Sequence, residues 1–568
     1  MDSIPGRPVS KKSKIVFAIA YAIWLAFVLV LASVPPVSRD ALTHHLAVPK
    51  LWVEGGGLIE IPHVLFSYYP QLLDLLYTIP LLAGHDIAAK YIHFVFAALT
   101  ALLIFSFVRR RLGAGWGAIA GIMFLTVPLV AKLSVTVYVD LGLMFFTMAA
   151  LYGAVLWLDD TSRIKWLLIA AVCSGLALST KYNAIVSFIV LSLLVPFFYL
   201  NTRQNKDAEQ INTVKYGVIF VSVSMLVFSP WLIRNLALTG NPLYPLQPGP
   251  FKVQVVETDT IQAATTAEEH AGLVTQYELG IQKKALGPLL TRKFVHEESL
   301  PYTLLIPVRI FFEGKDDDPK YFDGRLNPLL LVLPLLLIYF GRRVGFRPVE
   351  SPLFGYYALL MVLLVFMTKD MRLRWVATII PPLVVLATYS LYTMRRWLLS
   401  SGRSESVANF VTAAACAVYL LPNLSYASSL WAKVDPLPFV TGEQSYEEYR
   451  RAHLPEYGVV AAANEAVPEG GKLLVLYLGS RGYYFAVDAF PVNAVFTYLA
   501  ETATSGQGIG DRLRELGYTH VMVHDHLFVN WVDSSDDATQ ARVAEFVSQR
   551  LVPVAIENGF SLYRITPP

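Results

Sequence analysis

The sequence predicts an α-helical protein that crosses a membrane many times, with outer juxtamembrane helices and a small α/β domain at the C-terminus. Three observations predict this class. Hydrophobic residues make up 55% of the 568 residues and charged residues only 16%, whereas about a quarter of the residues in a soluble domain are charged. The hydrophobic residues form runs of membrane-spanning length. From about residue 435 these runs end, and charged and turn residues become frequent.

The long apolar runs predict about eleven spans, because most of them come near the roughly 20 residues that a helix needs to cross the hydrocarbon core. The first run follows a short basic segment and has no small-residue cleavage site at its end, so we expect an uncleaved first helix and not a removed signal peptide. The expected spans are residues 15–34, 88–108, 114–131, 138–158, 165–180, 183–200, 214–233, 327–341, 352–368, 375–394 and 406–422.

Residues 70–84 are apolar but short, and their placement decides the topology. If they form a helix that lies in the interface, every predicted cytoplasmic segment carries two or more basic residues, as the positive-inside rule requires. This choice predicts a cytoplasmic N-terminus. It places the loops 35–87 and about 235–326, and the C-terminal region, on the outer face.

The chain therefore divides into a membrane domain, residues 1–434, and an extracytoplasmic α/β domain, residues 435–568. Short apolar runs alternate with amphipathic segments in the second domain, which is typical of a sheet covered by helices. The expected strands are Leu473–Leu478, His520–His524 and Leu562–Ile565, and the expected helices are Tyr446–Arg451, Tyr457–Val467 and Gly510–Leu516.

Several ionisable residues stand at the predicted outer ends of the spans, where each has a functional and a structural interpretation. Asp40 ends the first span, and His44 and His45 follow at i+4 and i+5, so a helical segment would place all three near one face. Asp140 begins the fourth span, where a helix dipole also favours an acid. Lys181 lies between two spans, where a lysine also extends to the interface. An ionisable residue inside a span costs roughly 2.5–3.5 kcal/mol, so such residues are functional candidates.

A second group of charges lies in the turn before the span 375–394. Arg372 and Arg374, with Lys369 and Asp370, put positive charge on the outer side, which the positive-inside rule disfavours. Cations of this kind bind phosphate, and a carboxylate can deprotonate a hydroxyl or amine. The combination predicts a lipid-linked phosphosugar as substrate.

Four segments resemble motifs of the GT-C glycosyltransferases, in particular the group of aminoarabinose transferases, protein O-mannosyltransferases and rhizobial lipopolysaccharide glycosyltransferases. Asp40 to Lys50 is similar to the acidic first-loop motif, and Ser67 to Leu76 to the start of the juxtamembrane helix. Tyr138 to Phe146 resembles the acidic opening of the fourth span, and Gly175 to Tyr182 resembles the Gly-Leu-x-x-x-x-Lys turn. Arg372-Leu-Arg374-Trp is similar to a basic segment before a late span.

The resemblance implies an inverting sugar transfer from a polyprenyl-phosphate donor, with Asp40 as general base. It implies that Lys181, Arg372 and Arg374 neutralise the departing phosphate, and that Asp140 positions the acceptor or holds a cation. The remaining candidate substrate contacts are Arg39, His44, His45, Tyr69 and Tyr138. The chain departs from the family at Ala41, where many relatives have a second acid, and at Tyr69, where some have lysine.

The implied partners are the polyprenyl-phosphate-linked sugar, membrane lipids, and a lipid, glycan or protein acceptor. The net charge of +3 gives no reason to expect nucleic acid. We expect no cofactor, because no metal-ligand spacing as specific as His-Glu-x-x-His occurs, and the resemblance places the protein in a bacterial inner membrane. We also expect the loop 235–326 to cover the site and the C-terminal domain to contact the acceptor or to shield the outer face.

Two other functions remain open from the sequence. A transporter would need polar residues near the bilayer midplane and matched repeats or broken helices, and the middles of the spans are almost purely apolar. A polysaccharide ligase or polymerase of another fold would also use outer basic residues and a long outer loop.

Overall fold

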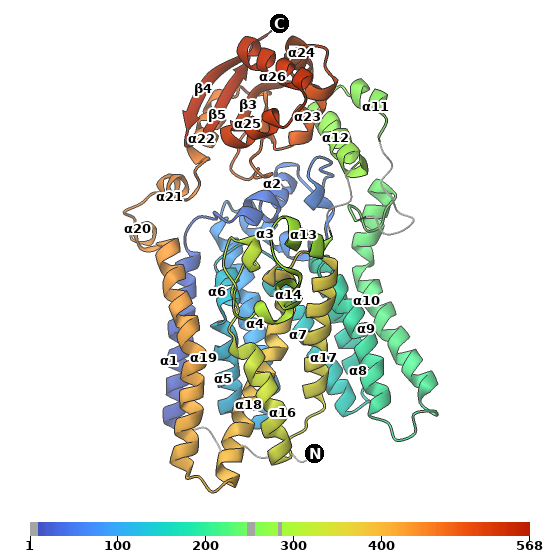
Figure 1. Cartoon of the computed structure of the whole chain (residues 1–568), viewed down its shortest axis with the longest axis vertical. Coiled ribbons are helices and arrows are strands. Elements are labelled where there is room, and N and C mark those ends of the chain that lie inside the picture. The colour runs from blue at the N-terminus through green and yellow to red at the C-terminus, as the bar shows by residue number, and fades with distance from the viewer. Residues whose placement is uncertain (1–9, 247–255, 282–286, 568) are drawn as a thin grey trace. The chain divides into compact units, whose positions relative to one another are not determined.

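The computed structural model describes residues 10–246, 256–281 and 287–567, and Figure 1 traces the chain from blue to red. The described residues form two compact units. The first takes its residues from Met1–Ser33, Lys90–Pro230 and Ala285–Pro436. The second takes them from Val34–Ala89, Trp231–Lys284 and Leu437–Pro568. Each unit is described by itself.

The first unit is helical, and its long helices run beside one another (Figure 1). The first turn of α4 and the last turns of α10 belong to the second unit. The helices are α1 (Lys11–Ala32), α4 (Ile87–Leu112), α5 (Ala114–Leu125), α6 (Pro128–Ser134), α7 (Asp140–Asp159), α8 (Lys165–Thr180), α9 (Ala184–Asn201), α10 (Gln210–Thr239), α13 (Pro288–Phe294), α14 (Leu300–Leu304), α15 (Ile306–Arg309), η3 (Pro319–Tyr321), α16 (Leu329–Val344), α17 (Glu350–Thr368), η4 (Leu373–Trp375), η5 (Ala377–Ile379), α18 (Ile380–Ser400) and α19 (Glu405–Val434).

All the predicted spans are helices. By length and composition, eight helices of the described residues can cross a membrane, and the bent pair α5 and α6 makes a ninth. The two other predicted spans are α8 and α16, with 16 residues each. At about 1.5 Å per residue they are roughly 24 Å long, which is a little less than the hydrocarbon core of about 30 Å.

The bend between α5 and α6 has a local cause in Pro128. Proline has no backbone N–H and pushes the residue before it out of the helical region. Val127 is accordingly extended, with a ψ angle of 130°, and Pro128 begins the next helix. The two helices meet at 69°.

A buried ion cluster ties four of the long helices together at one end. The guanidinium of Arg111 on α4 contacts Glu350 on α17 at 2.8 Å and Asp159 on α7 at 2.9 Å. The hydroxyl of Tyr389 on α18 donates to the same Glu350 carboxylate at 2.8 Å. Glu350 is fully buried, so its charge is stable there only because these partners surround it.

The second unit contains one sheet and shorter helices, of which η1 is a π-helix. Its helices are η1 (Ala41–His45), α2 (Ala47–Glu54), η2 (Leu65–Tyr68), α3 (Leu72–Leu82), α11 (Thr258–Ala263), α12 (Ala267–Ile281), α20 (Leu437–Val440), α21 (Tyr446–His453), α22 (Tyr457–Ala466), α23 (Asn493–Thr502), α24 (Gly506–Glu515), α25 (Asp525–Asp533) and α26 (Asp537–Arg550). Its strands are β1 (Lys472–Leu476), β2 (Asp488–Phe490), β3 (Tyr518–His524), β4 (Leu551–Glu557) and β5 (Phe560–Ile565).

The five strands follow the order β2-β1-β3-β5-β4. The pairs of β1 with β2 and with β3 are parallel, and the pairs of β5 with β3 and with β4 are antiparallel. Side chains alternate between the two faces, as the strand period requires. Leu474 and Leu476 pack with α23, α24, α26 and α12, whereas Leu473 and Val475 pack with α22.

The three predicted strands and three predicted helices of this region are present, with boundaries that differ by a few residues. The short strand β2 and the exposed edge strand β4 were not predicted. The predicted outer loop 235–326 contains several short helices, and its residues 247–255 and 282–286 lie outside the described residues. The ambiguous segment 70–84 contains α3, whose 11 residues are too few to cross a bilayer.

Candidate active site

An ion pair between Asp140 and Lys181 forms the centre of a charged cluster in the first unit. Asp140 is the first residue of α7 and is fully buried, and the partial positive charge of the helix N-terminus favours an acid there. Lys181 ends α8 in an extended conformation. Its Nζ donates to Oδ1 of Asp140 at 2.8 Å. The start of α7 and the turn after α8, which both carry predicted residues, are therefore in contact.

His93 on α4 fixes the start of α7 beside this ion pair. Its Nδ1–H donates to the carbonyl of Thr136 at 2.9 Å, and its Nε2 accepts from the backbone N–H of Leu141 at 3.1 Å. The ring is fully buried. His93 was not among the predicted site residues, because nothing in the sequence indicates a contact 48 residues away.

The basic turn between α17 and α18 contributes cations to the same unit. Lys369 donates to the side chain of Asn183 at 3.3 Å. Partial burial of the ammonium group, and then the charge of Lys181, lowers the pKa of Lys369. The guanidinium of Arg374 lies 5.6 Å from the ring centre of Tyr138, which is within the range of a cation–π contact. Lys181 therefore contacts Asp140, and Arg374 contacts Tyr138, two residues before Asp140 in the chain, and the role of these residues in substrate binding stays a prediction.

Arg372 has fewer partners than its neighbours. Its guanidinium lies 5.6 Å from the ring of Trp375. Its Nε–H is buried and has no hydrogen-bond acceptor among the residues that the structure describes. A guanidinium in this state is suited to a bound anion, because an unsatisfied buried donor costs free energy.

A second buried network holds the basic turn in place. Arg292 on α13 pairs with Asp370 at 2.8 Å and donates to the carbonyl of Lys320 at 2.7 Å. Arg309 binds Glu298 through two hydrogen bonds of 2.9 and 3.1 Å. Only 1% of the Arg292 side chain is exposed. Arg292, Glu298 and Arg309 were not predicted, because they lie in a segment without a motif.

The first predicted motif lies in the second unit, on the π-helical turn η1. A hydrogen bond of 2.9 Å from the N–H of Leu46 to the carbonyl of Ala41 closes this turn. The ring of His44 stacks on Phe66 with 4.3 Å between centres. Nδ1 of His45 lies 2.8 Å from Oδ1 of Asp74, and both side chains are almost fully buried. Asp74 on α3 thereby fixes the orientation of the His45 ring.

Asp40, His44 and His45 are close enough to hold a cation. Each offers one ligand atom, and these atoms lie within 4.8 Å of one another. A carboxylate with two imidazoles suits Zn²⁺ or a similar divalent ion, with positions left open for substrate. The same atoms can form hydrogen bonds to a sugar or to a hydroxyl acceptor.

The other two predicted residues of this unit have different surroundings. Tyr69 packs its ring edge against Phe66 at 5.3 Å, and burial raises the pKa of its hydroxyl. Arg39 is exposed and lies beside the turn of Gly479, whose φ of +67° favours glycine. Arg39 and Asp40 belong to one unit and Asp140 to the other, so their expected convergence in one cavity stays a prediction.

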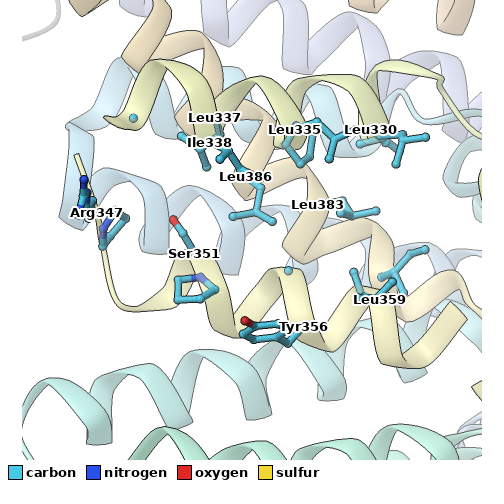
Figure 2. Close-up of a pocket in the computed structure, with 18 of the residues that line it drawn as sticks. Leu330, Leu335, Leu337, Ile338, Arg347, Ser351, Tyr356, Leu359, Leu383 and Leu386 are labelled. Carbon is cyan, nitrogen blue, oxygen red and sulfur yellow. The ribbon is translucent and has the colours of Figure 1, made fainter. Parts of the chain in front are cut away.

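An apolar groove of about 920 Å³ runs between α16, α17 and α18 of the first unit (Figure 2). Figure 2 shows Leu383 and Leu386 of α18 between the two other helices, with Arg347 and Ser351 at one end. Ile379 also lines the groove and follows the basic turn by only a few residues. The groove is suited to a long aliphatic chain. Its remaining labelled residues are Leu330, Leu335, Leu337, Ile338, Tyr356 and Leu359.

Residues 75–233 match the family model described as dolichyl-phosphate-mannose-protein mannosyltransferase. No curated protein matches the sequence. Two solved structures are similar in fold. ArnT from Cupriavidus metallidurans bound to undecaprenyl phosphate is 13% identical, with a TM-score of 0.54 over 99% of this chain and 100% of that chain. The archaeal oligosaccharyltransferase AglB from Archaeoglobus fulgidus, in complex with an inhibitory peptide and a dolichol-phosphate, is 11% identical, with a TM-score of 0.54 over 92% of this chain and 71% of that chain. These likenesses confirm the predicted GT-C fold.

Proposed function

We propose that this chain, which has the GT-C fold, transfers a sugar from a polyprenyl-phosphate donor to an acceptor on the outer face of a bacterial inner membrane. The observation that carries this proposal is the set of cations around the Asp140–Lys181 pair. There are more cations here than nearby carboxylates, and they are Lys181, Lys369, Arg372 and Arg374. Burial, and then the charge of Lys181, disfavours the protonated form of Lys369. A phosphate relieves this repulsion.

The apolar groove of the first unit supports a lipid-linked donor. Its volume of about 920 Å³ and its leucine-rich lining suit part of a prenyl chain. Ile379 in its wall is near the basic turn in the chain, so a prenyl chain in the groove would end close to the cations. The solved structure of ArnT holds undecaprenyl phosphate, and that of AglB holds dolichol-phosphate, which are ligands of this class.

In the proposed reaction Asp40 acts as general base. Its carboxylate accepts the proton of the acceptor hydroxyl while the hydroxyl oxygen forms a bond to the anomeric carbon. The bond from this carbon to the phosphate oxygen breaks on the opposite face, so the configuration inverts. The leaving polyprenyl phosphate takes the bonding electrons, and Lys181, Arg372 and Arg374 stabilise its charge. His44 and His45 contact the substrate. A cation held by Asp40 and these histidines would supply further positive charge.

The GT-C fold supports the proposed transferase over the two other functions that the sequence left open. A polysaccharide ligase or polymerase of another fold would require a fold that this chain does not have. A transporter would carry its polar residues along a path through the bilayer, whereas the described charged clusters lie at the helix ends. The acceptor remains one of three classes, which are lipopolysaccharide, cell-wall polymer and protein.

The test is transfer by the Asp40→Asn variant with a panel of polyprenyl-phosphate sugars. We expect its kcat to fall by about 100-fold or more, because general-base catalysis contributes roughly 10²–10⁴-fold, while donor binding is retained. The matched control is Asp533→Asn, which changes an exposed carboxylate at the end of α25 and should transfer at the wild-type rate. Wild-type turnover by Asp40→Asn would disprove the assignment of the base.

A further inference from the structure

A polar pocket of about 610 Å³ lies within the second unit, apart from the residues considered so far. One wall comes from α2 and the segment before α4, and the other from α21 and the chain after β1. The residues that carry its chemistry are Lys50, Glu54, Asp86, Tyr446, Arg450 and Tyr483. Its volume is in the range of small-ligand sites, which is roughly 300–1,000 Å³.

Aromatic rings hold a guanidinium rigidly in one wall of this pocket. The guanidinium carbon of Arg450 lies 4.1 Å from the ring centres of both Tyr446 and Tyr484. Its Nη1 donates to the hydroxyl of Tyr457 at 3.0 Å. Its Nε–H is buried and has no acceptor among the described residues. These contacts fix the guanidinium of Arg450 in the pocket wall, so it can bind a ligand without the entropic cost of ordering a free arginine.

A buried carboxylate faces the same space. Only 8% of Asp86 is exposed. Its two oxygens accept hydrogen bonds from the hydroxyls of Tyr446 and Tyr483, the second at 3.2 Å. Each carboxylate oxygen can accept a further hydrogen bond, so Asp86 can still bind a ligand hydroxyl. Lys50 of α2 also lines the pocket, and its Nζ donates to the carbonyls of Tyr483 and Phe485.

The charges of the pocket balance, which distinguishes it from the cationic cluster of the first unit. Lys50 and Arg450 are positive, and Glu54 and Asp86 are negative. A phosphate or carboxylate gains little in such a site, because it would meet two acids. A neutral polyol suits it better. Tyrosine rings accept the apolar C–H face of a sugar, and the carboxylate and guanidinium bind its adjacent hydroxyls.

We propose that this pocket binds a sugar unit of the acceptor, so that the acceptor is a glycan or glycolipid. This inference rests on the proposed function. The position of α2 supports it, because this helix joins the turn that carries Asp40 to Lys50 in the pocket. Ten helical residues span at most about 15 Å, which is the length of a few sugar units. The pocket would hold a sugar unit of the acceptor a few units away from the acceptor hydroxyl that attacks the anomeric carbon of the donor.

The first test measures saccharide binding without turnover. Full-length protein in nanodiscs is mixed with methyl hexopyranosides and free disaccharides, and saturation-transfer NMR detects contact with the sugar C–H groups. We expect binding that weakens about tenfold in Asp86→Asn and in Arg450→Lys, and that is unchanged in Asp533→Asn. Inorganic phosphate should not compete. Two variants are needed because either one alone could fail to fold, and each is checked by its thermal unfolding.

The second test asks which substrate the pocket holds. In both variants we expect the KM for a glycan acceptor to rise about tenfold, while the KM for the donor and kcat stay near wild type. A raised donor KM with an unchanged acceptor KM would overturn the assignment, and so would a panel of saccharides that shows no binding. Saccharide binding by a protein that transfers no sugar would refute the proposed function and leave the pocket standing.

Discussion

At the scale of single residues, the buried Asp140 and the cations around it have different energetic roles. Asp140 is fully buried, and its ion pair with Lys181 compensates for the loss of solvation. The side chain of Lys369 is largely exposed, although its ammonium group is partly buried; it donates to the amide oxygen of Asn183 at 3.3 Å and lies 5.3 Å from the ring centre of Trp375. Lys181 therefore stabilises the fold in addition to its proposed role in phosphate binding, whereas Lys369 pairs with no carboxylate among the described residues and contributes mainly to the proposed phosphate binding.

Two substitutions separate these roles. Lys369→Ala should weaken the binding of a polyprenyl phosphate about tenfold, since a hydrogen bond between charged groups contributes roughly 1.5–3 kcal/mol, and should leave the unfolding temperature unchanged. Lys181→Ala should weaken binding similarly and also lower stability by about 3–5 kcal/mol, because a buried charge loses its partner. Equilibrium binding and thermal unfolding measure the two effects. Unchanged phosphate binding in Lys369→Ala would contradict its assignment to the donor site.

The sequence predicted the residues that stand in motifs and missed the residues that support them. Asp140, Lys181 and Arg374 were selected because ionisable groups at span ends are costly. The structure places Lys181 against Asp140 and Arg374 against Tyr138, and their role in the site stays a prediction. His93, Asp74 and Arg292 were missed. Each acts through a partner that is 29 or more residues away, and no local pattern indicates such a contact.

At the scale of elements, the π-helical turn explains how Asp40 and both histidines share one face. In an α-helix of 3.6 residues per turn, i+4 lies about 40° from i but i+5 lies about 140° away. The wider turn of η1 brings His45 back toward Asp40, and the three ligand atoms lie within 4.8 Å of one another. The sequence predicted that Asp40, His44 and His45 lie near one face of a helix. It did not predict the π-helical turn, because the spacing of the residues does not distinguish a single widened turn from an α-helical one. Such turns are frequent at functional sites.

The Arg292 network makes a prediction about the segment between α12 and α16. Removing Arg292 takes the buried guanidinium partner from Asp370 and leaves Glu298 paired with Arg309, so Arg292→Met should destabilise this region by about 3–5 kcal/mol. Hydrogen exchange should rise in residues 287–326 and in the turn 369–374, with little change in α7 and α9. The control is Lys315→Met, which removes an exposed ion pair with Asp318 and should cost less than about 1 kcal/mol. Equal exchange in both variants would contradict the role of Arg292.

At the scale of the whole molecule, composition predicted the classes of structure but not which segments pack together. The apolar runs predicted the helices, and the change near residue 435 predicted the sheet region. Nothing in the sequence indicated that residues 34–89 and 256–281 pack with the C-terminal residues in one unit. Ile261, Ala267, Ala271 and Val274 of α11 and α12 join the core of the sheet, and these few small apolar residues are a weak signal.

The docking of α12 should depend on pH through His270. Its ring is 1% exposed and lies edge-on to Tyr498. Burial, and then the charge of Arg512, lowers the pKa of His270 from 6.5 to about 4. Between these values the unfolded chain binds a proton that the folded chain does not, so stability is present at neutral pH and is lost as the pH falls.

The expected loss for His270 between pH 6.5 and 4 is about 3 kcal/mol. In wild type the proteolytic susceptibility of α12 should rise as the pH falls through this interval. In His270→Phe, which keeps an aromatic ring, the rise should be smaller, with a residual part from His63, whose pKa is also lowered to about 4 by burial. An identical pH dependence in both proteins would exclude His270 as the cause.

The contacts of the π-helical turn have a consequence for the timing of synthesis. The hydroxyl of Thr43 donates to the carbonyl of Gly479, and the carbonyl of Leu42 accepts from the N–H groups of Gly482 and Tyr483. Thr43 and its partner are 436 residues apart. A ribosome that adds about 5–20 residues per second needs roughly 20 to 90 seconds to cover this distance. During that time Asp40 is already made but its turn lacks these backbone partners, so a nascent chain cannot complete the contacts of this turn before the C-terminal segment has been made.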